Sequence, residues 1–252
     1  MRLSPRLALA GLLVASATLP AFAFDEKEKK EIGEIVREYL IQNPEVLYEA
    51  QKEWNRRQEA KVAETREASL KTYLARIEEQ QLHTVIGNPQ GDVTLLEFFD
   101  YNCGFCRRAL KDIDQMIKDD PKLKIVLIEL PVIRPEESTG AAQVSIAVSR
   151  VAPDKFRAFH DKLLGSQTLA TKASALAAAK AVGVDEAALK AGLNDPEIER
   201  TLVEAKQLAD DLGVDATPTY VIGESVVPNT TAVVEDLKGR AAALRACGKA
   251  VC

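Results

Sequence analysis

The sequence is poor in the residues that crosslink or interrupt a chain. Its 252 residues include four cysteines, 13 glycines and 11 prolines, and it contains no internal repeat and no low-complexity tract. Four cysteines are too few to hold a chain of this length together, so a hydrophobic core must stabilise it, and 46% hydrophobic residues are enough to build one. The low glycine and proline content, with 28% charged residues, excludes wholesale disorder. The composition therefore indicates one or two folded domains.

The only long apolar run lies at the start of the chain. It extends from Leu7 to Leu19, after Arg2 and Arg6, and is followed by the small-residue pattern Ala21-Phe22-Ala23. Positive charge, an apolar run and an A-x-A site are the signature of a cleaved signal peptide, so we predict that residues 1–23 are removed on export. The alternative is an uncleaved membrane anchor, but an apolar run of about a dozen residues is shorter than the roughly 20 that span a bilayer.

An excess of positive charge is also missing. The chain carries 33 Lys and Arg against 38 Asp and Glu, a net charge of −5, and loss of the leader leaves 31 against 38, a net charge of −7. A phosphate backbone repels so acidic a protein, which argues against nucleic acid as a partner. Export places the chain in an oxidising compartment where disulfides persist. Cys103, Cys106, Cys247 and Cys252 all follow the leader, and one pair is free for chemistry.

The segment 24–82 is predicted to be helical, because it contains one proline, no strand-like run and many good helix formers. We expect one helix that ends near Gln42 and a second that starts after Asn43, a good N-cap, with Pro44 in its first turn. Each helix carries an apolar stripe: Ile32, Ile35, Val36, Tyr39 and Leu40 in the first, and Val46, Leu47, Ala50 and Trp54 in the second.

These two short helices cannot bury both stripes against each other, and the second continues as a solvated helix between residues 55 and 69. We therefore predict a homo-oligomer held together through residues 24–82. The alternative is that the first helix folds back on the rest of its own chain.

After residue 82 the pattern changes to short strand-like runs. The predicted strands are His83–Ile86, Val93–Phe99, Lys124–Leu130, Thr219–Ile222 and, as a fifth candidate, Ser225–Val227. An alanine-rich stretch from about 136 to 213, between the third and fourth strands, has the periodicity of several helices, and a last helix is expected from about Thr230 to Cys247. Residues 83–252 thus form an α/β domain with a helical insertion.

The tetrapeptide Cys103-Gly104-Phe105-Cys106 follows the second predicted strand and opens a stretch, 107–117, with helical apolar spacing. Two sulfurs at the first turn of a helix can close a disulfide, and the unpaired N–H groups there stabilise the thiolate of the first one. We predict that Cys103 is a solvent-accessible attacking thiolate and that Cys106 resolves the mixed disulfide.

Arg107 and Arg108 support this interpretation. Positive side chains in a first helical turn oppose the helix dipole, but beside a thiolate they lower its pKa, so we expect both to stabilise the anion. The alternatives are an inert disulfide and half of a zinc site. Zinc lacks ligands, since only His83 and His160 are available and there is no second Cys-x-x-Cys. An exposed disulfide at a helix start is of the labile kind.

Glu97 is an acid within an apolar strand. Val93, Leu95 and Phe99 share its face by alternation, so its carboxyl should be partly desolvated and its pKa raised. The alternative is a glutamate near a strand end whose charged group extends into water.

The order of these elements, with Ala216-Thr217-Pro218-Thr219 before a strand, resembles the DsbA-like branch of the thioredoxin superfamily over about residues 83–246. Segment 24–82, with its run Tyr39-Leu40-Ile41-Gln42-Asn43-Pro44-Glu45-Val46-Leu47, resembles the N-terminal domain of suppressor of copper sensitivity C (ScsC) proteins. The resemblance implies a thioredoxin fold with an inserted helical domain, preceded by a helical oligomerisation stalk, and a thiol-disulfide oxidoreductase of the bacterial periplasm.

The resemblance also assigns roles to residues. Glu97 takes the place of the family's buried acid, which accepts the proton of the resolving Cys106. Thr217 and Pro218 take the place of the cis-proline loop, whose backbone binds the substrate peptide. Without the resemblance, a trans proline at a strand start is the ordinary interpretation.

The remaining cysteines, Cys247 and Cys252, are five residues apart, and Gly248 between them can end a helix and let the tail turn back. We predict a small structural disulfide. The alternatives are free thiols and a metal-binding pair. His160 follows Phe156 and Phe159 and is expected to pack on a helix face rather than to bind a ligand.

The leading functional hypothesis is a disulfide isomerase or reductase that acts on exported proteins and is recycled by a membrane redox partner. It needs no resident metal or cofactor. Gly104-Phe105 lacks the histidine of the strongly oxidising Cys-Pro-His-Cys type, which favours an isomerase over a dithiol oxidase, the second hypothesis. The third is copper binding, because two soft thiolates suit Cu(I) and the resemblance to ScsC points to copper stress.

Overall fold

A computed structural model describes residues 25–80, 84–229 and 233–252. The predicted signal peptide, residues 1–23, lies outside these ranges, as do His83 and Thr230, where the first strand and the last helix are expected to begin. The chain divides into two units, Met1–Gln58 and Glu59–Cys252, and the boundary falls inside one long helix. Within the described ranges, no helix combines the length and the apolar character needed to cross a membrane.

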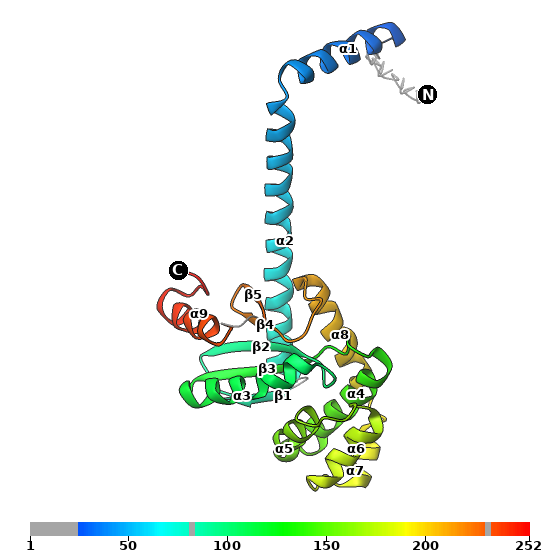
Figure 1. Ribbon diagram of the computed structural model, residues 1–252, viewed down its shortest axis with the longest axis vertical. Helices are drawn as coiled ribbons and strands as arrows, with labels where there is room; N and C mark the ends of the chain where they lie inside the picture. The colour runs from blue at the N-terminus through cyan, green and yellow to red at the C-terminus, as the bar shows by residue number, and fades with distance from the viewer. Residues whose placement is uncertain (1–24, 81–83, 230–232) are drawn as a thin grey trace, which may run out of the picture. The chain divides into compact units, whose positions relative to one another are not determined.

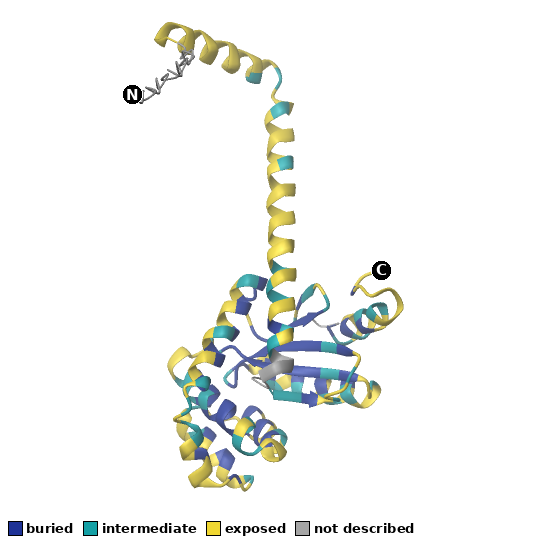
Figure 2. Cartoon of the chain, turned by 180° about the vertical axis from the view of Figure 1, so that it is seen from behind, coloured by how far each residue is buried: buried dark blue, intermediate teal, exposed yellow. Residues whose placement is uncertain are grey.

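The first unit consists of α1 (Glu26–Gln42) and the first part of α2 (Glu45–Gln80), labelled in Figure 1. Asp25 and Glu28 form a capping box, in which each backbone N–H donates to the other side chain at 2.8 Å. α1 ends at Gln42, as the sequence predicts. None of its residues is buried, and Figure 2 shows the helix mostly in the colour of exposed residues, so its apolar stripe has no partner among the described residues of the first unit.

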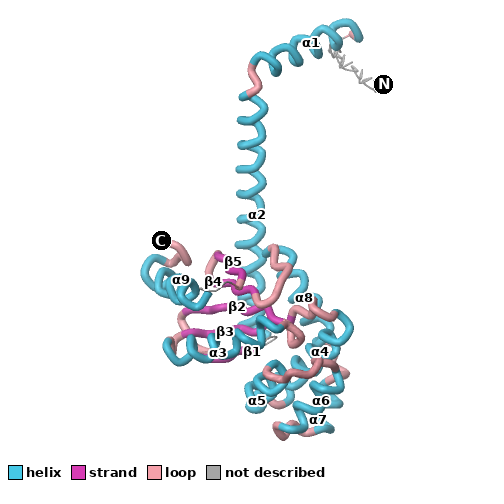
Figure 3. The backbone as a smooth tube through the Cα atoms, in the orientation of Figure 1, coloured by secondary structure: helices cyan, strands magenta, loops and turns pink. Residues whose placement is uncertain are grey.

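The second unit is built on a five-stranded mixed sheet of order β1-β3-β2-β4-β5, drawn in magenta in Figure 3. β2 runs parallel to β3, and the other neighbours are antiparallel. The strands are β1 (Thr84–Gly87), β2 (Val93–Phe99), β3 (Leu123–Glu129), β4 (Thr219–Ile222) and β5 (Ser225–Pro228). The helices are α3 (Gly104–Asp119), α4 (Pro135–Val151), α5 (Pro153–Leu164), α6 (Lys172–Ala181), α7 (Glu186–Gly192), α8 (Glu197–Leu212) and α9 (Val233–Cys247).

Helices α4 to α8 form the insertion between β3 and β4, which the sequence places at 136–213. α8 ends at Gly213, whose φ of +71° is the left-handed conformation that glycine adopts without strain. The α/β domain with a helical insertion is therefore the architecture observed.

Both faces of the sheet are covered, because β2 and β3 are buried almost throughout. On one face, Leu95 and Ile125 pack with residues of α3, α9 and the insertion. On the other face, Leu96 and Phe98 pack with α8 and with Tyr73 of α2.

The last part of α2 belongs to the second unit. Leu70, Tyr73 and Leu74, at helical spacing, pack against the second face of the sheet, and Ser69 donates to Asp211 of α8 at 2.7 Å. The sequence places the domain boundary between residues 82 and 83, whereas the structure divides the chain after Gln58. The last part of α2 belongs to the second unit because its apolar stripe packs on the sheet. This stripe is short and follows a long solvated stretch, so it does not stand out in the sequence.

Candidate active site

The Cys-x-x-Cys motif lies where β2 passes into α3. β2 ends at Phe99, and in the following turn Cys103 N donates to Asp100 O at 2.9 Å. Cys103 has an extended backbone (φ −81°, ψ 115°), and its sulfur accepts a hydrogen bond from Cys106 N at 3.3 Å. Cys103 is therefore the N-cap of α3, and the positive end of the helix dipole favours a negative charge on its sulfur.

The pKa of Cys103 is lowered from an ordinary 9.0 to about 6. The largest cause is the thiol of Cys106, which donates to the Cys103 sulfur; burial opposes the change, and the Thr217 side chain and the backbone N–H groups of Cys106 and Phe105 lower the pKa further. Most Cys103 side chains are thus ionised at neutral pH, as a nucleophilic thiol requires.

Cys106 is the opposite kind of thiol. Its side chain is fully buried, and burial raises its pKa far above the ordinary range, with the hydrogen bond to Cys103 and the charge on that residue acting in the same direction. The two cysteines are free in this structure, which therefore represents the dithiol form. Cys103 can attack, while Cys106 stays protonated until it is needed.

Cys103 is less accessible than the sequence predicts. Only 3% of the residue is exposed, although Phe105, two residues on, is 58% exposed. The carbonyl of Thr217, contributed by the loop before β4, lies against the sulfur. A substrate can therefore reach only the small exposed part of Cys103.

Thr217 and Pro218 lie beside Cys103, and the peptide bond between them is cis. The thiol of Cys103 donates to Thr217 O at 3.1 Å. The Thr217 hydroxyl oxygen is buried and has no hydrogen-bond partner among the described residues, so it is available to the thiolate once the Cys103 proton has left.

Glu97 is the fifth of the seven residues of β2 and is only 4% exposed, so its carboxyl does not extend into water. Its pKa is raised from 4.5 to about 8, first by burial and then by the charge of Cys103, with Arg157 of α5 lowering it. Its cross-strand neighbours are Leu127 and Tyr220, so no cation of the sheet lies directly opposite. A carboxyl with this pKa exchanges its proton near neutral pH and can serve as base for Cys106.

The two arginines after the motif, which the sequence predicts to stabilise the Cys103 thiolate, contact other groups. Arg107 Nε donates to Leu164 O at 2.9 Å, and the Arg108 guanidinium lies 4.2 Å from the ring centroid of Phe105. Neither is among the main causes that lower the pKa of Cys103. The helix start and the Cys106 thiol stabilise the anion instead.

Sequence reasoning missed two polar residues that support the site. Asp100, 1% exposed, accepts from Val132 N and Ile133 N, each at 2.9 Å, and from the hydroxyl of Ser138 at 2.8 Å. Asn102 bonds to the insertion through its side-chain amide. The signal was present: polar residues between a buried strand and the motif need partners of their own.

Tyr101, between these two, reaches a buried polar cluster. Its hydroxyl lies 2.8 Å from Ser145 Oγ and 3.1 Å from His160 Nδ1. His160 is 3% exposed and stacks with Phe156, and burial lowers its pKa to about 3, so the imidazole stays neutral. It packs within the helical insertion, as expected.

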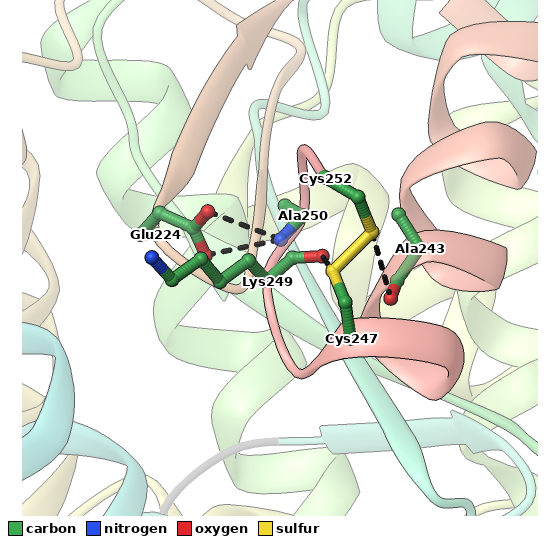
Figure 4. The surroundings of a disulfide bond; sticks show 6 residues. All are labelled: Glu224, Ala243, Cys247, Lys249, Ala250 and Cys252. Atoms are coloured by element: carbon green, nitrogen blue, oxygen red, sulfur yellow. Dashed lines mark hydrogen bonds between the residues drawn. A yellow bond between two sulfur atoms is a disulfide. The ribbon is translucent and has the colours of Figure 1, made fainter.

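Cys247 and Cys252 form a disulfide at the end of α9 (Figure 4). The enclosed tail places Ala250, 2% exposed, against the turn between β4 and β5, where Ala250 N donates to both carboxylate oxygens of Glu224 at 3.0 and 3.2 Å. Gly223 allows this approach, since a Cβ at that position would lie 3.3 Å from the Ala250 Cβ. The disulfide ties the end of the chain to α9, and the hydrogen bonds to Glu224 join the tail to the β4–β5 turn.

Comparison with known proteins gives two family matches. Residues 94–238, more than half of the chain, match the DSBA-like thioredoxin domain, and residues 28–61 match the copper resistance protein ScsC N-terminal domain. Disulfide bond formation protein D of Bacillus subtilis (strain 168) is 26% identical over 157 residues, which are 58% of this chain and 69% of that protein.

Solved structures agree with these matches. A thioredoxin-like oxidoreductase from Silicibacter pomeroyi DSS-3 is 34% identical, with a TM-score of 0.60 over 66% of this chain and 95% of the other. Proteus mirabilis ScsC in a transitional conformation is 26% identical, with a TM-score of 0.60 over 86% of this chain and 94% of the other. The predicted DsbA-like thioredoxin fold with a helical insertion and an ScsC-type N-terminal segment is confirmed.

Proposed function

The chain belongs to the DSBA-like thioredoxin family of thiol-disulfide oxidoreductases, and from that premise we propose that it is a periplasmic disulfide isomerase and reductase of exported proteins. The observation that carries the proposal is the contrast between the two sulfurs at the start of α3. The pKa of Cys103 is about 6, whereas Cys106 is a fully buried thiol.

The proposed cycle starts when the Cys103 thiolate attacks one sulfur of a wrong disulfide. A mixed disulfide forms, and the other substrate sulfur leaves as a thiolate that takes a proton from water. In isomerisation this thiolate attacks a different disulfide of the substrate, and a substrate thiolate finally displaces Cys103, so no electrons are gained or lost. In reduction Cys106 gives its proton to Glu97 and displaces the substrate sulfur as a thiolate. Cys103 and Cys106 are thereby oxidised to a disulfide, and the substrate disulfide has gained two electrons and become two thiols.

The pKa of Cys103 favours isomerase over strong oxidase activity. A very stable thiolate favours the reduced enzyme and makes its disulfide a strong oxidant, as in sites whose pKa is about 3.5, whereas reductases have values of about 7. Cys103, with a pKa of about 6, is closer to the second group. Gly104-Phe105 supplies no histidine that would lower this pKa further.

A homo-oligomer through the N-terminal unit is part of the proposal. Eight of its large apolar side chains are at least 42% exposed in the single chain: Ile32, Ile35, Val36, Tyr39, Ile41, Leu47, Tyr48 and Trp54. Burial of such side chains is worth roughly 1.5–3 kcal/mol each, so a second copy that covers them stabilises an assembly. An assembly would carry several active sites, which lets more than one of them attack the same misfolded substrate.

The test compares three proteins in the refolding of scrambled ribonuclease A: the intact chain, a chain that begins at Glu59, and Cys103→Ser. We expect activity from the intact chain, a large loss without the N-terminal unit, and none from the serine variant. Equal activity of the first two would remove the role of the oligomer. A strongly oxidising potential, with oxidation of reduced substrates and no refolding of scrambled ones, would identify a dithiol oxidase instead.

The proposal includes a membrane redox partner that keeps Cys103 and Cys106 reduced. An isomerase must stay reduced in an oxidising compartment, and exchange with the surroundings alone would oxidise it. Such a partner must reach the same small exposed part of Cys103, beside Thr217, that a substrate reaches.

Copper binding is a second candidate, which the match of residues 28–61 to a copper resistance protein domain favours. The two active-site sulfurs are joined by a hydrogen bond and are soft ligands that suit Cu(I). Among the described residues there is no group of three or more His, Cys, Asp and Glu side chains placed for a metal. Anaerobic Cu(I) titration of Cys103→Ser and of a Cys247/Cys252 double serine variant locates the ion. Tight binding that survives only in Cys103→Ser assigns it to the tail.

A further inference from the structure

The residues on either side of the Cys-x-x-Cys motif hold the two ends of one loop of the insertion. Asn102 directly precedes the motif and Arg107 directly follows it. The loop, residues 165–171, joins α5 to α6 and is called the insertion loop below. We propose that Asn102, with Arg107, is a positioning residue that fixes the insertion loop beside Cys103 and thereby sets the affinity for unfolded, apolar polypeptide substrates. This inference rests on the proposed function and names the feature of the substrate that the site recognises.

Asn102 uses the whole of its amide group. Its Oδ1 accepts from Ala170 N at 2.8 Å, and its Nδ2 donates to Ala170 O at 2.9 Å and to Ser138 Oγ at 2.9 Å. Only an amide supplies an acceptor and two donors in this geometry, and the N–H and C=O of Ala170 fix which way it faces. Ser138 in turn donates to Asp100, so the contact reaches both α4 and the insertion loop.

Arg107 holds the other end of the insertion loop. Its Nε donates to the carbonyl of Leu164, the last residue of α5, at 2.9 Å. A charged donor makes the stronger class of hydrogen bond, and the C-terminal carbonyls of a helix are natural acceptors for it. The residues directly before and directly after the motif thus both form hydrogen bonds at the ends of the insertion loop.

The hydrogen bonds of Asn102 and Arg107 connect two segments that each carry an exposed apolar side chain, the insertion loop and the start of α3. Leu169, beside Ala170, is 42% exposed, and Phe105, inside the motif, is 58% exposed. Neither Asn102 nor the insertion loop is among the main groups that lower the pKa of Cys103. The loop therefore acts on a substrate only if the substrate extends beyond the reacting disulfide, as a polypeptide with apolar side chains near its cysteine does.

The test measures a single reaction in the intact chain. Reduced protein is mixed with short peptides whose cysteine carries glutathione as a mixed disulfide. Cys103 attacks the peptide sulfur, the S–S bond breaks, glutathione leaves as a thiolate, and Cys106 then releases the peptide thiol as the enzyme disulfide forms. One peptide has leucine and phenylalanine beside its cysteine, a second has serine in their place, and glutathione disulfide is the small probe.

We expect Asn102→Ala to raise the half-saturating concentration of the apolar peptide by about tenfold, which corresponds to the loss of one or two net hydrogen bonds. The serine peptide, glutathione disulfide and the pH profile of Cys103 alkylation should not change. Arg107→Ala should have the same effect and serves alone if Asn102→Ala does not fold. Asn88→Ala is the matched control, since Asn88 donates to Pro121 O and accepts from Gln90 N in a turn before β2 and should leave all probes unaffected.

An unchanged half-saturating concentration in the folded variants overturns the inference. So does an equal loss with all three probes, or a shifted alkylation profile, because either result means that Asn102 and Arg107 act on the thiol itself. The readout needs no isomerase turnover. An intact chain that fails to refold scrambled ribonuclease A, yet shows the difference between peptides, refutes the proposed function and keeps the positioning role.

Discussion

The carbonyl oxygen of Thr217 lies 3.1 Å from the sulfur of Cys103, and the hydroxyl of the same threonine is buried with no partner among the described residues. The carbonyl can only accept, so it suits the thiol, whereas the hydroxyl can donate and suits the thiolate. One residue, 114 positions further along the chain, therefore serves both protonation states of the nucleophile.

Removal of the hydroxyl tests this arrangement. Thr217→Val keeps the shape of the side chain and deletes the donor, so the pKa of Cys103 should rise from about 6 by up to about one unit, while Thr217→Ser should leave it near 6. The rate of Cys103 alkylation as a function of pH measures both variants. If Cys103 has the same pKa in the valine variant as in the intact protein, the helix start and Cys106 alone determine it.

Glu97 should destabilise the fold at alkaline pH. Its pKa is 4.5 when unperturbed and about 8 in the fold, so the folded state holds a proton that the unfolded state releases between these values. Stability falls as pH rises through this window. With Cys103 and Cys106 oxidised, the charge of Cys103 is absent and burial alone raises the pKa of Glu97, so the shift is smaller than in the dithiol form. Glu97→Gln should then match the intact protein at pH 4 and exceed its free energy of unfolding by about 3 kcal/mol at pH 9.

Urea unfolding at several pH values measures the effect. Glu224→Gln is a control of opposite sign, because backbone N–H groups lower the pKa of Glu224, and its charge stabilises the fold above the unperturbed value and less as pH falls. Parallel pH curves for Glu97→Gln and the intact protein would mean that the Glu97 carboxyl is not desolvated. The same variant should also slow the closing of the Cys103–Cys106 disulfide at least about tenfold, since Cys106 loses its base.

The position of the domain boundary predicts how truncated chains behave. A chain that begins at Glu59 keeps Ser69, Leu70 and Tyr73 and should be a folded monomer with an unchanged alkylation profile. A chain that begins at Lys71 loses the bond from Ser69 to Asp211 and the packing of Leu70, and should be about 1–3 kcal/mol less stable.

Light scattering and urea unfolding measure the two truncations. An oligomer formed by the chain from Glu59 would contradict assembly through the N-terminal unit. Equal stability of both chains would contradict the packing of α2 on the sheet.

The tail disulfide should contribute to stability and not to catalysis. It closes a loop of only six residues, from Cys247 to Cys252, for which chain entropy gives about 2 kcal/mol. The double serine variant should have a free energy of unfolding in urea that is lower by about this amount and should exchange the Ala250 amide faster, with Cys103 alkylation unchanged. A loss of disulfide exchange activity with unchanged stability would assign these sulfurs to the reaction.

The local elements were predictable from the sequence because local patterns determine them. β2 and α3 follow from a buried apolar run and helical spacing on either side of the motif, and the alternation in β2 placed Glu97 among apolar neighbours. The boundary within α2 was not predictable from the sequence. Leu70, Tyr73 and Leu74 form an apolar stripe that is too short to stand out after a long polar stretch.

The partners of the site were beyond reach for a different reason. Arg107 is next to Cys106 in sequence, yet its side chain bonds to Leu164, 57 positions away. Asn102 and Ala170 are 68 positions apart, and no period or motif joins them. Proximity along the chain does not show which side chains contact each other, because the contacts at a loop are made by segments that only the complete fold brings together.

Cys103 closes the start of α3 with the same atom that performs the reaction. Once that sulfur is bonded to a substrate it carries no charge, and the amide of Cys106 is left with a much weaker acceptor. We therefore expect the first turn of α3 to be less stable while a substrate is attached to Cys103 than after its release. The stability of this first helical turn would then differ between the free enzyme and the mixed disulfide with a substrate.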